Sequence, residues 1–176
     1  MAKKCQQTVQ IDPELARLAI GLNLANQFRL WVIVKSVTRT ADGSGKVAKK
    51  EFFTALRNFG IKYSRQHRRR LLNSGERLFW NEDKKYIYVR SSQHVASELT
   101  QLAIDNNPAL LSNRAGVTEV YIPSAGSLEQ WEANIYAGWL DHRENPIISR
   151  ETLEGLFGRT PETLRRWEQD RLQGTL

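Results

Sequence analysis

Apolar residues at helical spacing define three short segments in the first half of the chain. Residues 27–38 are apolar along most of their length and follow Asn26, a residue that often caps helices. Their spacing fits a buried helix or a buried strand, and their length favours a helix. Residues 49–59 carry apolar side chains at helical spacing before a glycine, a common helix stop. Ser64 caps a shorter segment, residues 65–74, so we expect three helices.

Aromatic and β-branched residues dominate the next stretch. Residues 77–80 and 86–90 have the composition of strands, and the five polar residues between them, 81–85, are typical of a hairpin connection. The predicted order is helix, short strand, helix, turn, helix, hairpin. In order, length and charge, residues 26–90 resemble the winged helix-turn-helix domains of phage and plasmid replication initiators and many bacterial regulators. The resemblance implies that the third helix enters the major groove of DNA.

The second half of the chain contains further helical patterns separated by turn-forming residues. Ser91 or Ser92 caps a helix whose apolar face ends near Ala103, and residues 105–108 end it. Residues 117–123 predict a strand. Ser127 then caps a helix with five apolar residues, among them two of the five tryptophans of the chain: Leu128, Trp131, Ile135, Trp139 and Leu140. We interpret the tryptophans as core residues, with a base-stacking surface as the alternative.

The C-terminal segment, residues 147–172, predicts two short helices with a tight turn between them. Ser149 caps the first, Gly158 ends it, and Thr160 caps the second. Such a pair is a helix-turn-helix. The second helix contains Thr-Leu-Arg-Arg-Trp-Glu, residues 163–168, which resembles the TLRYYE or TLRYWE stretch in the DNA-binding helix of the MerR family.

The MerR resemblance implies a phosphate contact for Arg165. It places Arg166 and Trp167 at the two aromatic positions, so Arg166 departs from the family pattern. The motif also lies at the C-terminal end, with no wing sequence after it. The alternative is a helix-turn-helix that serves packing or binds another protein.

These patterns predict a mainly α fold with a small β-hairpin, built from tandem helix-turn-helix domains of which the first is a winged helix. We expect the first domain over residues 1–104 and the second over residues 127–176. Residues 105–126 would form a linker with a short strand.

Charge is distributed unevenly along the 176 residues. The chain has 26 Lys and Arg against 19 Asp and Glu, a net charge of +7. Residues 26–90 hold 16 basic and five acidic side chains, whereas residues 91–176 hold seven and 12. A basic excess confined to one segment favours a polyanionic partner such as nucleic acid, with a solvated face that binds nothing as the alternative.

Other classes of protein find no support in the pattern. No apolar run is long enough for a membrane span or a secretory signal, and a single cysteine, Cys5, cannot form an intrachain disulfide. We therefore expect a cytoplasmic, nucleoid-associated protein without membrane contact. The three histidines are scattered, and phosphate-binding loops are absent from the sequence, so we expect no metal, no cofactor and no enzymatic activity.

The densest basic stretch, residues 64–75, supplies the candidate DNA-reading helix. If Leu71 and Leu72 face the core, helical geometry turns four other side chains outward. Arginine pairs with guanine, and glutamine or asparagine with adenine, which suits the predicted base contacts: Gln66, Arg69, Arg70 and Asn73. Arg68 falls on the inner side, where we expect its stem to cover the core and its guanidinium to find a carboxylate.

Further basic residues are predicted to hold the DNA backbone. Two lie on the flanks of that helix, three around the start of the preceding helix, two at the hairpin tip and two in the C-terminal motif. They are Arg65, His67, Lys46, Lys49, Lys50, Lys84, Lys85, Arg165 and Arg166.

The sequence therefore predicts a non-enzymatic, sequence-selective protein that binds double-stranded DNA. Its role would be that of a regulator, or of a replication or recombination accessory factor, of a bacterial or mobile element. The alternative is an adaptor whose basic half binds nucleic acid while residues 127–176 recruit a protein. Structured RNA is a third candidate ligand. Palindromic half-sites one helical turn apart would imply a homodimer.

Overall fold

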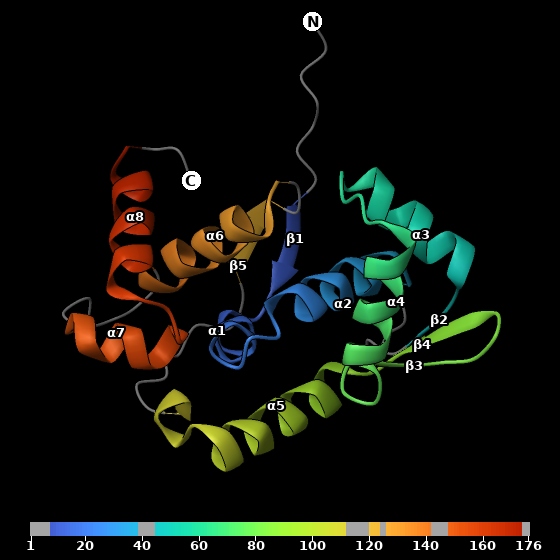
Figure 1. Cartoon of the computed structure of the whole chain (residues 1–176), viewed down its shortest axis with the longest axis horizontal. Coiled ribbons are helices and arrows are strands. Elements are labelled where there is room, and N and C mark those ends of the chain that lie inside the picture. Colours follow the sequence, from blue (N-terminus) through green and yellow to red (C-terminus); the bar gives the residue numbers. More distant parts are fainter. Residues whose placement is uncertain (1–7, 39–44, 112–119, 124–125, 142–147, 174–176) are drawn as a thin grey trace, which may run out of the picture.

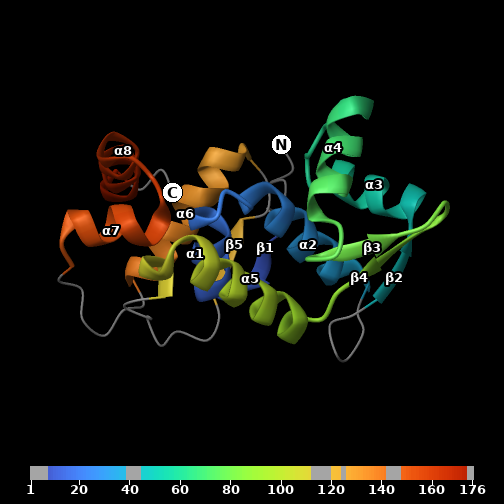
Figure 2. The same cartoon turned by 60° about the horizontal axis from the view of Figure 1, so that its bottom comes forward.

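The computed structural model describes residues 8–38, 45–111, 120–123, 126–141 and 148–173. The described chain is mainly helical and contains a small three-stranded antiparallel sheet. Helix α2 lies in the middle, with α3, α4 and the sheet on one side and α6, α7 and α8 on the other, and α5 runs beneath both (Figure 1; Figure 2). No helix within the described ranges is both long and apolar enough to cross a membrane.

The predicted order of elements from α2 to the hairpin is confirmed. It comprises α2 (Ala25–Thr38), β2 (Gly45–Ala48), α3 (Lys49–Asn58), α4 (Arg65–Gly75), β3 (Trp80–Glu82) and β4 (Tyr86–Val89). Strand β4 is central, and the sheet order is β2-β4-β3. Asn26 does not cap α2: it lies within the first turn, where its Oδ1 accepts a hydrogen bond of 2.6 Å from the Tyr63 hydroxyl.

The hairpin is shifted from its predicted position. Its first strand begins at Trp80, not at Arg77, and Asn81 and Glu82 belong to that strand, so only residues 83–85 connect it to β4. Arg77 has a φ of 72°, and its N–H donates to the carbonyl of Trp80, which makes a turn where the composition predicted a strand. The Trp80 indole N–H donates 2.9 Å to the carbonyl of Leu72 and so fixes the hairpin to α4.

The remaining elements pack together from both ends of the chain. They are β1 (Thr8–Ile11), α1 (Pro13–Gly21), α5 (Ser92–Asn106), η1 (Pro108–Leu111), β5 (Val120–Pro123), α6 (Leu128–Asp141), α7 (Arg150–Phe157) and α8 (Pro161–Leu172). Strands β1 and β5 pair in antiparallel register, and α1 contacts α5, α6 and α7. Residues 105–126, expected to form a linker, therefore contribute a 3₁₀ helix and a paired strand to the packed structure. Helix α1, which was expected to belong to the first domain, also packs against the C-terminal half.

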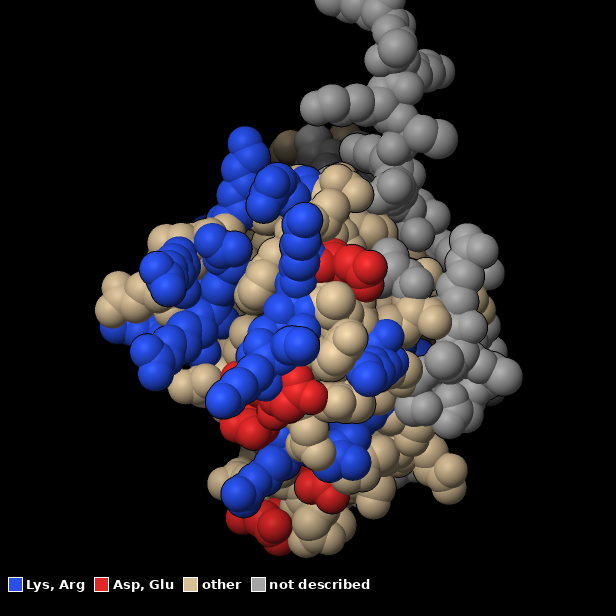
Figure 3. All heavy atoms as spheres, turned by 90° about the vertical axis from the view of Figure 1, so that its right-hand side faces the viewer, with Lys and Arg blue, Asp and Glu red and all other residues tan. Residues whose placement is uncertain are grey.

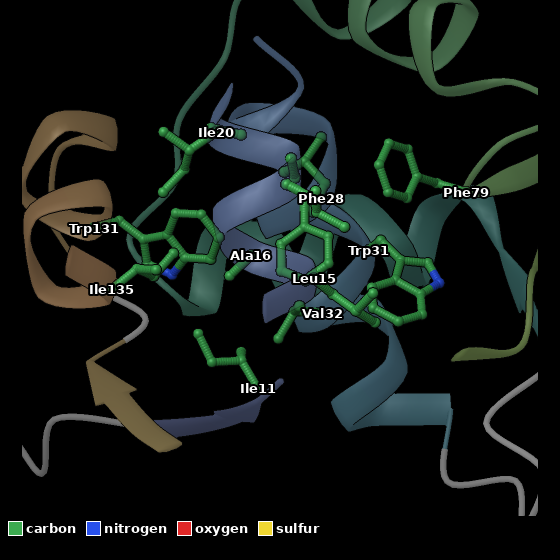
Figure 4. Packing of buried hydrophobic residues seen from close by; sticks show 14 of the residues in the cluster. Ile11, Leu15, Ala16, Ile20, Phe28, Trp31, Val32, Phe79, Trp131 and Ile135 are labelled. Carbon is green, nitrogen blue, oxygen red and sulfur yellow. The ribbon is translucent and has the colours of Figure 1, made fainter. Parts of the chain in front are cut away.

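One hydrophobic cluster extends across the whole described chain. Phe28 of α2 joins its parts, because its ring centroid lies 5.4 Å from that of Trp31, 6.2 Å from Phe79 and 6.1 Å from Trp131 of α6 (Figure 4). All five tryptophans are buried, so their interpretation as core residues is confirmed. The base-stacking alternative for them is excluded by the same burial.

The C-terminal pair of helices has the predicted caps. The side chains of Ser149 and Thr160 accept from backbone N–H groups of the first turns of α7 and α8. Gly158 ends α7 in the left-handed conformation with a φ of 57°. A Cβ at this position would also lie 3.0 Å from the carbonyl oxygen of Gly21, so the turn needs glycine both for its conformation and for its contact with α1.

Candidate nucleic-acid interface

Helix α4 presents its polar face to solvent. The Ser64 Oγ accepts a 3.2 Å hydrogen bond from the backbone N–H of His67 and caps the helix. Leu71 and Leu72 are buried against the core, as the helical phase predicted. The four predicted base-contacting residues are all exposed: Gln66, Arg69, Arg70 and Asn73. The helix stands out from the rest of the molecule on the side of α3 and the hairpin (Figure 2).

Arg68 takes the inner position expected of it but finds a different partner. Its guanidinium carbon lies 4.9 Å from the centroid of the Phe53 ring of α3, and the side chain is half-buried. The expected carboxylate contact is therefore wrong: the aromatic face of Phe53 takes its place. This contact packs α4 onto α3 and leaves the outward arginines to solvent.

The first turn of α4 is braced by an aromatic stack. The His67 ring lies over Tyr63, with centroids 4.7 Å apart and an angle of 22° between the planes. Burial raises the pKa of the Tyr63 hydroxyl, which donates to Asn26 in α2. His67 and Arg65 both stay exposed at this end of the helix, where the sequence predicted phosphate contacts.

The three lysines predicted around the start of α3 occupy different environments. Lys49 and Lys50 are its first two residues, and Lys50 is exposed. The Nζ of Lys49 lies 2.7 Å from the Glu82 carboxylate of β3, so this ammonium is paired within the chain. Lys46 is not at the helix start: it lies on β2, with Nζ 3.9 Å from the centroid of the Tyr86 ring.

Asp83, one of the residues predicted to connect the two strands, shapes the tip of the hairpin. Asp83 Oδ1 accepts hydrogen bonds of 2.7 Å from the backbone N–H groups of Lys85 and Tyr86, and Oδ2 accepts one of 2.8 Å from the Tyr88 hydroxyl. These bonds, led by those of the Tyr86 and Lys85 N–H groups, lower the pKa of Asp83 to about 2. Lys84 and Lys85 are exposed beside it, as predicted. Aspartate at a turn commonly accepts such hydrogen bonds from the backbone two or three residues further on.

Basic side chains dominate the side of the molecule formed by α3, α4 and the hairpin (Figure 3). Within residues 45–90, Lys49 with Glu82 is the one ion pair. We call the remaining exposed cations of α3, α4 and the hairpin tip the basic face: Lys50, Arg57, Arg65, Arg69, Arg70, Lys84 and Lys85. Lacking ion-pair partners in the described chain, these groups are available to phosphates and to the edges of bases.

Unlike the cations of the basic face, most arginines of the C-terminal helices form ion pairs with carboxylates. Arg166 pairs with Glu129, and Arg171 pairs with Asp141. A guanidinium nitrogen of Arg150 lies 2.7 Å from a carboxylate oxygen of Glu168. The corresponding distance between Arg159 and Glu132 is 2.9 Å. Arg165 differs because it is exposed and has no ion pair within the described residues. Trp167, at the second aromatic position of the MerR-like stretch, is buried against Tyr136 with ring centroids 5.5 Å apart. Of the two predicted backbone contacts in this motif, only Arg165 is unpaired.

The described residues hold no cluster of His, Cys, Asp and Glu that would bind a metal ion. Comparisons of the chain with protein-family models, with curated proteins and with solved structures found no match.

Proposed function

We propose that this chain is a sequence-selective protein that binds double-stranded DNA through residues 25–90, a winged helix-turn-helix in which α4 is the recognition helix. The observation that carries the proposal is the outward face of α4, where two unpaired arginines lie between two amide side chains. Its role is that of a regulator, or of a replication or recombination accessory factor, of a bacterial or mobile element.

The order of the elements supports this proposal. Helices α2, α3 and α4 precede a hairpin whose inner strand pairs with β2, and α4 packs on α3 through Arg68 and Phe53. A helix with only one face in the core leaves the other free to enter the major groove, which is wide enough to admit it. The hairpin is then the wing, and we assign the exposed lysines at its tip to the sugar-phosphate backbone.

Chemistry on α4 supports base contacts rather than phosphate contacts alone. Arg69 and Arg70 can each donate two parallel hydrogen bonds to guanine, and Gln66 and Asn73 can pair with adenine in the same way. We assign the remaining cations of the basic face, with His67, to the backbone, which fixes the position of the helix on the duplex.

The paired arginines of the C-terminal half favour a second function for that half. Arg150, Arg159, Arg166 and Arg171 are each engaged by a carboxylate, and releasing them to DNA would leave those carboxylates unpaired. We therefore favour a protein partner for the helix-turn-helix of α7 and α8, with Arg165 as its one remaining candidate for a phosphate. In this form the chain is an adaptor as well as a DNA-binding protein.

Selection of bound fragments from random duplex DNA, followed by footprinting, tests the proposal. Arg69→Ala should then weaken binding to the selected site by about 1–3 kcal/mol and binding to random DNA only slightly. Lys50→Ala is the matched control, because loss of a phosphate contact weakens both alike. Failure to enrich any sequence would contradict base recognition, and stronger binding to structured RNA in competition would make RNA the ligand.

A further inference from the structure

The outer face of the three-stranded sheet carries aromatic and basic side chains that the proposed contacts of α4 do not use. Along β4, side chains alternate between the core and solvent, so that Tyr86 and Tyr88 share the outward face. Lys46 of β2 is directly opposite Tyr88 in the register of the sheet, and Asn81 of β3 is opposite it on the other side. A tyrosine in the central strand is therefore flanked by a cation and an amide.

Tyr88 is exposed yet held in place. Its exposed fraction is 39%. Few large hydrophobic side chains are exposed in the part of the chain that the structure describes, and Tyr88 is the aromatic one among them. Its hydroxyl donates to Asp83 at the hairpin turn, and Lys46 Nζ lies 5.7 Å from the centroid of its ring. The ring is thus oriented by its hydroxyl, while its face lies beside an ammonium group that can reach a phosphate.

An unpaired nucleotide matches this arrangement. A base stacks on an aromatic face, and the phosphate attached to it attracts a nearby cation. The same hairpin carries Lys84 and Lys85 at its tip, so a strand that leaves the duplex beside the wing would continue along a basic surface. Double-stranded DNA has no base available for such stacking, because its bases are stacked on one another.

We propose that the outer face of the β2-β4-β3 sheet binds an unpaired nucleotide next to the duplex bound by α4, with the base on Tyr88 and its phosphate near Lys46. This inference rests on the proposed duplex binding. The preferred ligand of the protein is then a duplex that ends in, or opens into, a single strand, as occurs where DNA is melted or processed.

Two labelled DNAs that carry the same selected duplex site test the proposal. One is blunt, and the other has a short single-stranded extension containing 2-aminopurine, a base whose fluorescence falls on stacking. The full-length chain should bind the extended DNA about tenfold more tightly, with quenched fluorescence. Tyr88→Ala should remove this preference and the quenching but leave the affinity for blunt DNA unchanged. Tyr88→Phe keeps the ring and should keep both.

Arg69→Ala is the matched control, because it should weaken binding to both DNAs by the same factor and keep the preference. Equal affinity of the unaltered chain for the two DNAs overturns the inference, as does a Tyr88→Ala chain that retains the preference. Failure of the proposed function has a different signature: the unaltered chain then binds neither blunt nor extended duplex.

Discussion

Arg17 of α1 donates a hydrogen bond of 3.2 Å to the backbone carbonyl of Leu156 in α7, 139 residues further along the chain. The same guanidinium lies 2.9 Å from the carboxylate of Glu14, and that carboxylate also accepts from the indole N–H of Trp139 in α6 at 3.0 Å. The Arg17 side chain is 1% exposed. A buried polar network therefore joins the first helix to the C-terminal half.

Loss of Arg17 should destabilise the fold severely. Removing one partner of a buried ion pair leaves the other charge uncompensated, which costs about 3–5 kcal/mol. Arg17→Ala should lower the free energy of unfolding by this amount in urea denaturation. Arg165→Ala, which removes an exposed and unpaired guanidinium, should change it by less than about 0.5 kcal/mol. Equal effects of the two substitutions would show that the network adds nothing to stability.

Division of the chain after residue 104 should produce a fragment that does not fold by itself. Such a fragment keeps α1 but loses α6 and α7, against which α1 packs. It also lacks Trp131, whose ring contacts Phe28 in the full chain. We expect weak near-ultraviolet circular dichroism and non-cooperative unfolding for residues 1–104. A fragment with a sharp, cooperative transition would contradict the single packed core. Lost DNA binding by an unfolded fragment would say nothing about contacts made by the C-terminal half.

The sequence predicted local features far better than long-range ones. Serine and threonine caps, the stop at Gly158 and the phase of Leu71 and Leu72 each depend on neighbouring residues. These local signals located the helices and correctly predicted which side chains of α4 face outward. The pairing of β1 with β5 and the bond from Arg17 to Leu156 depend on residues more than a hundred positions apart. No spacing along one segment encodes such contacts.

The same distinction explains the errors at the candidate site. Arg68 was correctly placed on the inner side of its helix, but its partner Phe53 lies on another helix. Arg166 resembled a DNA-contacting position, yet its carboxylate partner comes from α6, 37 positions earlier in the sequence. Helical phase predicts which way a side chain points, and only the packing of helices determines what it meets.

Two glycines should respond in opposite ways to the same substitution. A Cβ at Gly75, the last residue of α4, would collide with the Trp80 ring, whereas a Cβ at Gly155 in α7 meets nothing within 4 Å. Gly75→Ala should cost about 1–3 kcal/mol by forcing apart α4 and the hairpin. Gly155→Ala should stabilise the chain by about 0.5–1 kcal/mol, because alanine favours the helix. Urea denaturation measures both, and a stabilised Gly75→Ala chain would contradict the described contact.

Salt dependence should separate the two halves of the molecule. Neutralising about six phosphates gives a slope near −5 when log K is plotted against log salt concentration. Replacing Lys84 and Lys85 together by alanine should reduce the magnitude of this slope by about two. Replacing Arg166 and Arg171 together should leave it unchanged, because both arginines already pair with carboxylates. A smaller slope from the second pair would place the C-terminal helices on DNA.

The turn of the hairpin should weaken in acid. Backbone hydrogen bonds lower the pKa of Asp83 from its ordinary value of 3.8 to about 2, so the folded chain binds this proton less readily than the unfolded chain. The stabilisation by the ionised carboxylate is complete above the ordinary value and is lost as the pH falls towards 2. Asp83→Asn keeps an oxygen for the N–H groups of Lys85 and Tyr86 but carries no charge. The unfolding temperatures of the unaltered and the Asp83→Asn chains should therefore differ most near neutral pH and become equal in acid. A difference in unfolding temperature that stays constant with pH would contradict the role of the charge.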